Sequence, residues 1–425
     1  MTKRRKRPNL FGWALFGLVV LFGYYFNQVY LPSQPNPFEA TPTVTRSPES
    51  FVTEAESLFK DGKLVQAIDA YQSAIDASPQ NPALYIAIAR IQVWAGQYEE
   101  AQANAENAIL LNNESSMAHA VRAWALDFQG KNSDAIEEID KAIELDPQNA
   151  IAHAYRVEIL IDSNNFDYIE KAIDVSKSAL ALDPNALETR RARGYLLEAT
   201  ANYPEAIDFF RSALDVNPNI PILHIELGRN LRQIAVYDQA IDEFTKANTL
   251  NPADPEPEFF ISRTYATEGE YAKALQYAKA AVEDKPTDAG LHANYGVMFF
   301  RNFQYQEAVN ELGLAVNGGK TENGLPITGL LLTNDLRTAE YYYTYGLALA
   351  RTNQCGQALP IAQKLQTMFS SDDSVQQAAT AINQICQENL DNPAVDTPTP
   401  AAEETTVVET EIPVETDVPI TTATP

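Results

Sequence analysis

A pattern that returns about every 34 residues constrains this chain more than any other feature. In the stretch YPEAIDFFRSALDVNP, small residues stand at Ala206 and Ala213, an aromatic at Phe210 and a proline at Pro218. A fixed period of this length predicts a solenoid of helix–turn–helix units rather than one ordinary core. The same landmarks recur as Ala67, Tyr71, Ala74 and Pro79; as Ala135, Ile139, Ala142 and Pro147; as Ala240, Phe244, Ala247 and Pro252; and as Ala274, Ala278, Ala281 and Pro286.

The first half of each unit agrees with this reading. In residues 221–254, Leu227-Gly228 precedes Leu231, and Tyr237 begins the turn before the Ala-x3-Phe helix. The chain therefore resembles the tetratricopeptide repeat family, whose pattern is W-x2-L-G-x2-Y…A-x3-F…P. The resemblance covers residues 48–390. It implies an all-α, right-handed superhelical solenoid of about nine helix–turn–helix units that binds proteins.

Two segments of the solenoid depart from the repeat. Residues 321–338 form an insert after the eighth unit, where a proline is expected and Gly318-Gly319-Lys320-Thr321 stands instead. We interpret the insert either as a binding loop or as a segment that folds back to cover a space between units. Residues 374–389 place apolar side chains on one helical stripe, which predicts a capping helix at the end of the array.

The N-terminus predicts a membrane anchor. The basic run KRRKR (residues 3–7), within an expected cytoplasmic segment 1–9, precedes the uncharged run LFGWALFGLVVLFGYYFNQV. About 20 helical residues span the roughly 30 Å hydrocarbon core, so residues 10–30 predict a transmembrane signal anchor. The preceding cations would keep the N-terminus in the cytoplasm and the solenoid outside it, as in a single-pass, bacterial-type plasma membrane protein. A cleavable signal peptide is the alternative, but no small-x-small cleavage site stands near residues 20–30.

The segments that flank the solenoid have no pattern typical of a folded core. Residues 31–47 are a proline-rich linker. The 35 residues from Asp391 hold nine Thr, six Pro and eight acidic residues, without Lys or Arg, and are expected to be disordered. The formal net charge of the chain is −26, which argues against nucleic-acid binding because that needs a basic face.

The two cysteines predict a disulfide. Cys355 begins the second helix of unit nine, Cys386 lies near the end of the capping helix, and the turn between these helices is centred between them. In an antiparallel helix pair, residues equidistant from the turn lie at the same height. A bond between them would add roughly 3–4 kcal/mol and suit an oxidising compartment. Two unrelated buried thiols are the alternative.

The sequence offers little chemistry for catalysis. All four histidines occupy position 4 of their units, which favours packing between helices over a metal site: His119, His153, His224 and His292. Gly318-Gly319-Lys320-Thr321 imitates the end of a P-loop, but Leu314 replaces its first glycine and a helix precedes it. We therefore expect no enzyme, no cofactor and no metal.

The resemblance implies that the first helix of each unit lines a concave groove. The positions assigned to it in units five to nine combine arginines with aromatic residues, a lining that suits an acidic or C-terminal peptide. The alternative is that the arginines pair with Glu188, Glu198 and Glu226 of adjacent helices. The candidate groove residues are Arg191, Tyr195, Arg229, Arg232, Phe259, Arg263, Phe300, Arg301, Tyr343 and Arg351.

These observations predict a membrane-tethered scaffold outside the cytoplasm that binds a protein partner. Two alternatives remain open. One is a cytoplasm-facing assembly adaptor of the same fold. The other is an accessory subunit of a cell-envelope enzyme, or an enzyme whose site the sequence does not reveal.

Overall fold

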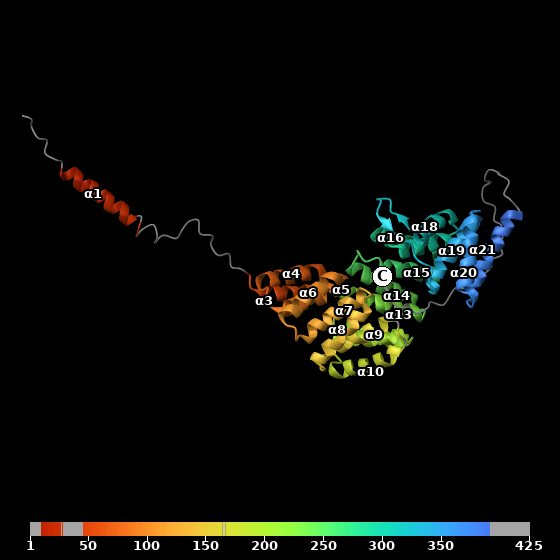
Figure 1. Ribbon diagram of the computed structural model, residues 1–425, viewed down its shortest axis with the longest axis horizontal. Coiled ribbons are helices and arrows are strands. Elements are labelled where there is room, and N and C mark those ends of the chain that lie inside the picture. Colours follow the sequence, from red (N-terminus) through yellow and green to blue (C-terminus); the bar gives the residue numbers. More distant parts are fainter. Residues whose placement is uncertain (1–9, 27, 29–45, 164, 166, 392–425) are drawn as a thin grey trace, which may run out of the picture. The chain divides into compact units, whose positions relative to one another are not determined.

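The computed structural model describes residues 10–26, 28, 46–163, 165 and 167–391. The chain divides after Ser47 into two compact units, and within the described residues it contains 20 helices and one short β-hairpin (Figure 1). The prediction of an all-helical solenoid is confirmed. The expected cytoplasmic segment 1–9, most of the linker 31–47 and the tail beyond Asp391 lie outside the described residues.

The first unit contains helix α1 (Leu10–Tyr25), which is 16 residues long. At 1.5 Å per residue it extends for about 24 Å, which is less than the roughly 30 Å of a hydrocarbon core. A search of the described residues finds no helix with both the length and the apolarity to cross a membrane. The predicted transmembrane span over residues 10–30, and the single-pass plasma membrane localisation that depends on it, are therefore wrong.

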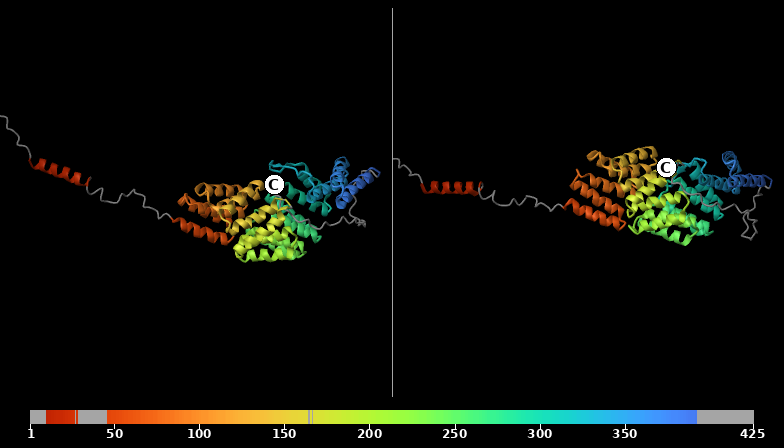
Figure 2. Two further views of the ribbon diagram at one scale, coloured as in Figure 1. Left: turned by 60° about the horizontal axis from the view of Figure 1, so that its bottom comes forward. Right: turned by 90° about the horizontal axis from the view of Figure 1, so that it is seen from below.

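The second unit is an array of helix pairs that follow one another along the chain (Figures 1 and 2). The first helices of the nine pairs are α3 (Pro48–Lys60), α5 (Pro82–Trp94), α7 (Ser116–Phe128), α9 (Ala150–Asp162), α11 (Leu187–Ala199), α13 (Pro221–Gln233), α15 (Glu256–Thr267), α17 (Ala289–Arg301) and α19 (Leu336–Arg351). The second helices are α4 (Leu64–Ala77), α6 (Tyr98–Leu111), α8 (Asn132–Leu145), α10 (Asp167–Leu182), α12 (Tyr203–Leu214), α14 (Tyr237–Leu250), α16 (Tyr271–Asp284), α18 (Tyr305–Asn317) and α20 (Cys355–Met368). Each first helix packs against its own second helix, and most also pack against the first helix of the next pair.

A left-handed residue closes the turn within most pairs. At the end of α5, Gly96 has φ +75°, and its N–H donates to the carbonyl of Val93 at 3.1 Å. The next N–H, of Gln97, donates to the carbonyl of Gln92 at 2.8 Å, so the last carbonyls of the helix are satisfied before the chain reverses. Glycine fits this conformation without a steric penalty. Alanine at 201 and 235, phenylalanine at 303 and asparagine at 353 adopt it as well.

The repeated glycine and aromatic positions explain the close packing within a pair. A methyl group built on Gly228 would lie 2.6 Å from Cε1 of Phe244, and one on Gly194 would lie 2.9 Å from Cε1 of Phe210. Phe210 and Phe244 are fully buried. Because the ring needs the space that a side chain at the glycine would fill, the two landmarks occur together in the sequence.

Beyond the eighth pair, the chain forms a hairpin and then a final helix. Strand β1 (Gly319–Lys320) pairs antiparallel with β2 (Pro326–Ile327). The segment that follows returns to the helices, because the Leu330 N–H donates to the Ala315 carbonyl at 2.8 Å and Leu332 is buried in their core.

Helix α21 (Asp373–Asp391) packs against both α19 and α20. Val375, Ala379 and Ile382 on α21 are buried in the same core as the apolar residues of unit nine. In the structure a disulfide joins Cys355 to Cys386, and their Cα atoms lie 5.5 Å apart. The bond therefore ties the last helix to the last pair.

Candidate functional site

The first helices form the inner side of the array. Arg90 on α5 forms an ion pair with Glu188 on α11, and Arg263 on α15 forms one with Glu340 on α19. The partners come from first helices two or three units apart. Side chains can reach that far only if the array curves toward its first helices, so we call this surface the first-helix face.

In the middle of the array, this face is filled by a buried ion network. Arg191 donates from Nη1 to Glu158 at 2.6 Å, and from Nη2 and Nε to Glu226 at 2.6 and 3.0 Å. Trp124 donates from its indole nitrogen to the same Glu158 oxygen at 2.9 Å. Arg191 and Glu158 are each only 2% exposed and Glu226 1%. One guanidinium therefore joins carboxylates from α9 and α13, on either side of its own helix α11.

A second pair continues the network. Arg229 on α13 contacts Glu198 on α11 at 2.9 Å, and Asn230 donates to the same carboxylate at 3.0 Å. Arg191 and Arg229 thus contact glutamates of adjacent helices, which is the alternative that the sequence offered for them. Their guanidiniums point into the protein rather than toward solvent.

Two more predicted groove residues lie in the same buried region. The Tyr195 hydroxyl donates to the carboxylate of Asp162. Arg232 is 6% exposed and contacts the Thr267 hydroxyl at 3.4 Å. Neither side chain is placed to meet an extended ligand.

The start of the array closes over this network. The Asn219 side chain donates to the Lys60 carbonyl at 2.8 Å, so the turn of unit one meets the connection between units five and six. The Arg191 guanidinium lies 5.3 Å from the Trp94 ring centre, within the range of a cation–π contact. Together with the Arg90–Glu188 ion pair, these contacts cover the first-helix face of units five and six with units one and two.

The buried network contains more carboxyl groups than arginines. Burial raises the pKa of the Glu158 carboxyl to about 7; Arg191 opposes this shift and Glu226 adds to it. Burial likewise raises the pKa of Asp162 to about 6 and that of Asp127 well above its usual value. The carboxyl groups of this network therefore bind their protons more tightly than exposed carboxyl groups do.

Around Glu340 on α19, the charge balance is the opposite. Burial alone would raise the pKa of the Glu340 carboxyl. The guanidiniums of Arg263, Arg301 and Arg337 outweigh burial and hold that pKa below its usual value. We call these three arginines the arginine cluster. All three act on the same carboxylate, and all three are half-buried.

Aromatic side chains lie beside the arginine cluster. Arg337 lies over the Phe259 ring, 5.9 Å from its centre. Phe259, Phe300 and Tyr343 are half-buried on α15, α17 and α19, and Arg351 is exposed at the end of α19. These later residues of the predicted groove are therefore partly accessible, whereas Arg191, Tyr195, Arg229 and Arg232 are buried.

Sequence reasoning missed two members of this site, Arg337 and Glu340. Arg337 lies within the residues assigned to the insert, yet α19 already begins at Leu336. Asp335 could have indicated this earlier start, because aspartate is a favoured residue at the N-terminus of a helix. In the structure its side chain caps α19 by accepting from the Thr338 N–H at 2.8 Å.

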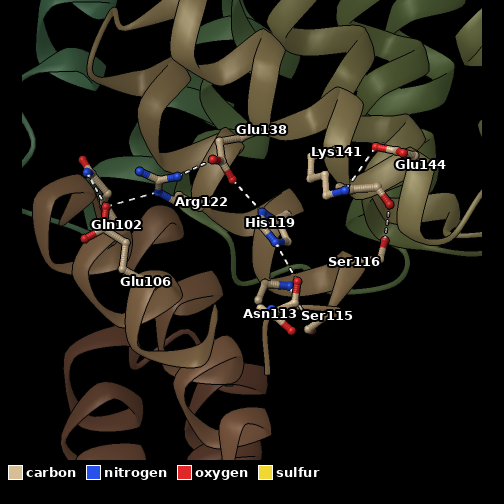
Figure 3. Close-up of polar contacts among 12 residues, drawn as sticks. Gln102, Glu106, Asn113, Ser115, Ser116, His119, Arg122, Glu138, Lys141 and Glu144 are labelled. Carbon is tan, nitrogen blue, oxygen red and sulfur yellow. Dashed lines mark hydrogen bonds and ion pairs between the residues drawn. The ribbon is translucent and has the colours of Figure 1, made fainter. Parts of the chain in front are cut away.

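Three of the four histidines join the two helices of their unit. His119 contacts Glu138 through Nδ1 at 2.7 Å and the Asn113 carbonyl through Nε2 at 3.2 Å (Figure 3). His224 and His292 make the equivalent contacts with Glu243 and Glu311, again 19 residues further along the chain. Figure 3 also shows Arg122 between Glu106 and Glu138, extending the contacts to unit two. Among the described residues, no group of three His, Cys, Asp or Glu side chains is placed to hold a metal ion.

Comparison with protein families identifies the repeats. Models described as tetratricopeptide repeat match residues 58–125, and residues 121–167 and 261–319. These segments of the chain match the tetratricopeptide repeat family. Such repeats generally serve as scaffolds for protein–protein interaction, which supports the repeat family and the general role expected from the sequence.

Curated relatives of these tetratricopeptide repeats match over short segments. A DnaJ homolog subfamily C member 7 homolog of Schizosaccharomyces pombe is 26% identical over 167 residues, 36% of this chain and 34% of its own length. Human RNA polymerase II-associated protein 3 is 29% identical over 122 residues, 28% of this chain and 18% of its own length. The chain therefore spans about a third of the first relative and less of the second.

Two solved structures are also similar to the tetratricopeptide repeat array. A tetratricopeptide repeat protein from Parabacteroides merdae is 17% identical, with a TM-score of 0.40 over 59% of this chain and 98% of its own. Yeast Tom70 is 15% identical, with a TM-score of 0.42 over 81% of this chain and 96% of its own.

Proposed function

We propose that this protein is an interaction scaffold that holds an acidic segment of a protein partner on the first-helix face of units seven to nine. The observation that carries the proposal is the arginine cluster. Arg263 pairs with Glu340 at 2.9 Å, and Arg301 and Arg337 also hold the pKa of that carboxyl low, in a chain whose net charge is −26. A cluster of cations on an acidic protein attracts a negatively charged ligand selectively, because the rest of the surface repels it.

The chemistry of the site fits a peptide. Guanidinium groups bind carboxylates through two parallel hydrogen bonds, and they are always charged. Phe259 and Phe300 offer half-buried ring surface next to these charges. A segment that mixes carboxylates with apolar side chains would use both features, whereas an isolated anion would use only the first.

A photo-crosslinking amino acid tests this assignment in cells that make the full chain. Placed at Phe300 on α17, it should capture a partner whose crosslinked peptide is acidic. Placed at Tyr271 on the second helix α16, it should not. Capture from both positions in equal yield, or crosslinks to basic segments, would contradict the proposal.

Charge reversal provides the matched control. The double change Arg301→Glu and Arg337→Glu should lower capture at least tenfold, because both cations become repulsive. Lys273→Glu with Lys279→Glu changes the net charge equally on the exposed surface of α16, where both lysines are more than half exposed. That control should capture the partner as the unchanged chain does.

A further inference from the structure

The arginine cluster has a potential ligand within the same chain. Residues 392–425 contain no Lys or Arg and carry Asp396, Glu403, Glu404, Glu409, Glu411, Glu415 and Asp417. Valine, isoleucine and proline alternate with these acids from Val407 to Ile420. The segment, which we call the acidic tail, therefore combines the carboxylates and apolar groups that suit arginines set among aromatic rings.

The last described residues lie beside a helix of the first-helix face. The Asn389 side chain, near the end of α21, donates to the Ala350 carbonyl at 2.9 Å, and Ala350 lies in the last turn of α19. The disulfide between Cys355 and Cys386 holds the same end of α21 against the pair that contains α19. The acidic tail therefore starts beside the exposed Arg351, at one end of the last helix of the first-helix face.

The distance from this point to the arginine cluster is within reach. Arg337 lies 13 residues before Ala350 on α19, which at 1.5 Å per residue is about 20 Å along the helix. An extended chain covers up to about 3.3–3.6 Å per residue, so the dozen residues between Asp391 and Glu403 span up to roughly 40 Å. The acids from Glu403 onward can thus lie over the cluster without strain in the connection.

We propose that the acidic tail occupies the first-helix face of units seven to nine and competes with the partner for the arginine cluster. The proposal rests on the proposed function of that face and adds its regulation. Because the tail is tethered, its effective concentration at the site is in the millimolar range, so even weak contacts oppose a free ligand. A partner then gains access only when it binds more tightly than the tail or when another event removes the tail.

A synthetic peptide of residues 401–420, labelled with a fluorophore, measures this competition directly. It should bind the chain that ends at Asp391 at least tenfold more tightly than it binds the full chain. A full-length variant in which the seven tail acids are replaced by Gln or Asn should bind the peptide as the shortened chain does. Added salt should weaken binding to the shortened chain, because the contact is ionic.

Two further outcomes decide the proposal. Arg301→Glu with Arg337→Glu in the shortened chain should abolish peptide binding, whereas Lys273→Glu with Lys279→Glu should leave it unchanged. Equal binding to the full and shortened chains, or binding to neither, would overturn the tail as an occupant. If a partner still crosslinks through position 300 while the peptide gives either of these results, the proposed function stands. Only the proposed regulation by the acidic tail then fails.

Discussion

Arg191 lies between two buried carboxylates, and the three side chains come from three consecutive repeats. Each charge loses its hydration on burial, which costs several kcal/mol per ion, and only the mutual contacts offset that cost. Arg191 makes contacts of 2.6 Å to both Glu158 and Glu226. The arrangement is stable because all three side chains are present. Removing the central cation should therefore destabilise the fold by more than the net free energy that its contacts contribute, because two carboxylates stay buried.

Replacing Arg191 with Met tests this dependence. Met fills much of the same volume but leaves two carboxylates buried without their cation, so we expect a loss of about 3–5 kcal/mol in the free energy of unfolding. Lys177→Met is the matched control. Lys177 and its partner Asp174 are 67% and 75% exposed, and breaking that pair should cost about 0–1 kcal/mol. Urea titrations of the full chain would measure both values, and similar losses would refute a shared buried network.

The repeat period of the sequence predicts part of this ion network. Glu158, Arg191 and Glu226 are separated by 33 and 35 residues, close to one repeat, so equivalent positions of stacked helices bring them together. The Arg90–Glu188 pair spans 98 residues and depends on how strongly the array curves. The curvature is the sum of small rotations at each interface between repeats, and no local sequence pattern predicts it. The sequence therefore predicted a shared face for Arg191 and Arg229 without deciding whether it is open.

At the scale of elements, the turn of unit one makes a contact that the turn of unit two lacks. Gly62 and Gly96 both close turns in the left-handed region, with φ +76° and +75°. A methyl group on Gly62 would lie 2.8 Å from the Asn219 carbonyl oxygen, whereas one on Gly96 would meet nothing within 4 Å. The two glycines thus have the same backbone requirement and different surroundings.

This difference makes Gly62→Ala and Gly96→Ala a matched pair. Both introduce left-handed strain, on the order of 1–2 kcal/mol. Gly62→Ala should cost about 1–3 kcal/mol more, because its methyl group forces unit one away from the connection between units five and six. Chemical denaturation of the two variants would measure the gap. Equal losses would mean that the turn of unit one does not close against Asn219 in solution.

At the scale of the whole molecule, the arginines of the first-helix face differ in how accessible they are. Units two to six bury more carboxylates than arginines, and units seven to nine hold the arginine cluster. From the sequence we expected arginines along the whole stretch from unit five onward. The structure divides them because units one and two cover the earlier ones. Closure of the array, rather than residue type, thus determines which arginines a ligand can reach.

Burial makes the stability of this molecule depend on pH in a definite direction. The pKa values of Glu158 and Glu256 are raised by burial to about 7, and that of Asp162 to about 6. A carboxyl whose pKa is higher in the folded than in the unfolded chain binds its proton more tightly when folded. Its stabilising contribution is complete below the unfolded pKa and is lost as pH rises through the folded pKa. Glu243 and Glu340, whose pKa values are lowered, contribute in the opposite sense and lose their effect only as pH falls below about 4.5.

The thermal midpoint of the full chain should therefore be highest near pH 5 and should fall as pH rises to 8. Glu158→Gln should flatten this fall, because its amide cannot ionise while its oxygen can still accept from Trp124 and Arg191. A shift from 4.5 to about 7 corresponds to a pH-dependent contribution on the order of 3 kcal/mol for this residue. Asp174→Asn, at a residue 75% exposed, should leave the pH profile unchanged. Circular dichroism melts at pH 5, 6, 7 and 8 would measure the slopes, and a midpoint that rises from pH 5 to 8 would contradict the raised pKa values of the buried carboxyl groups.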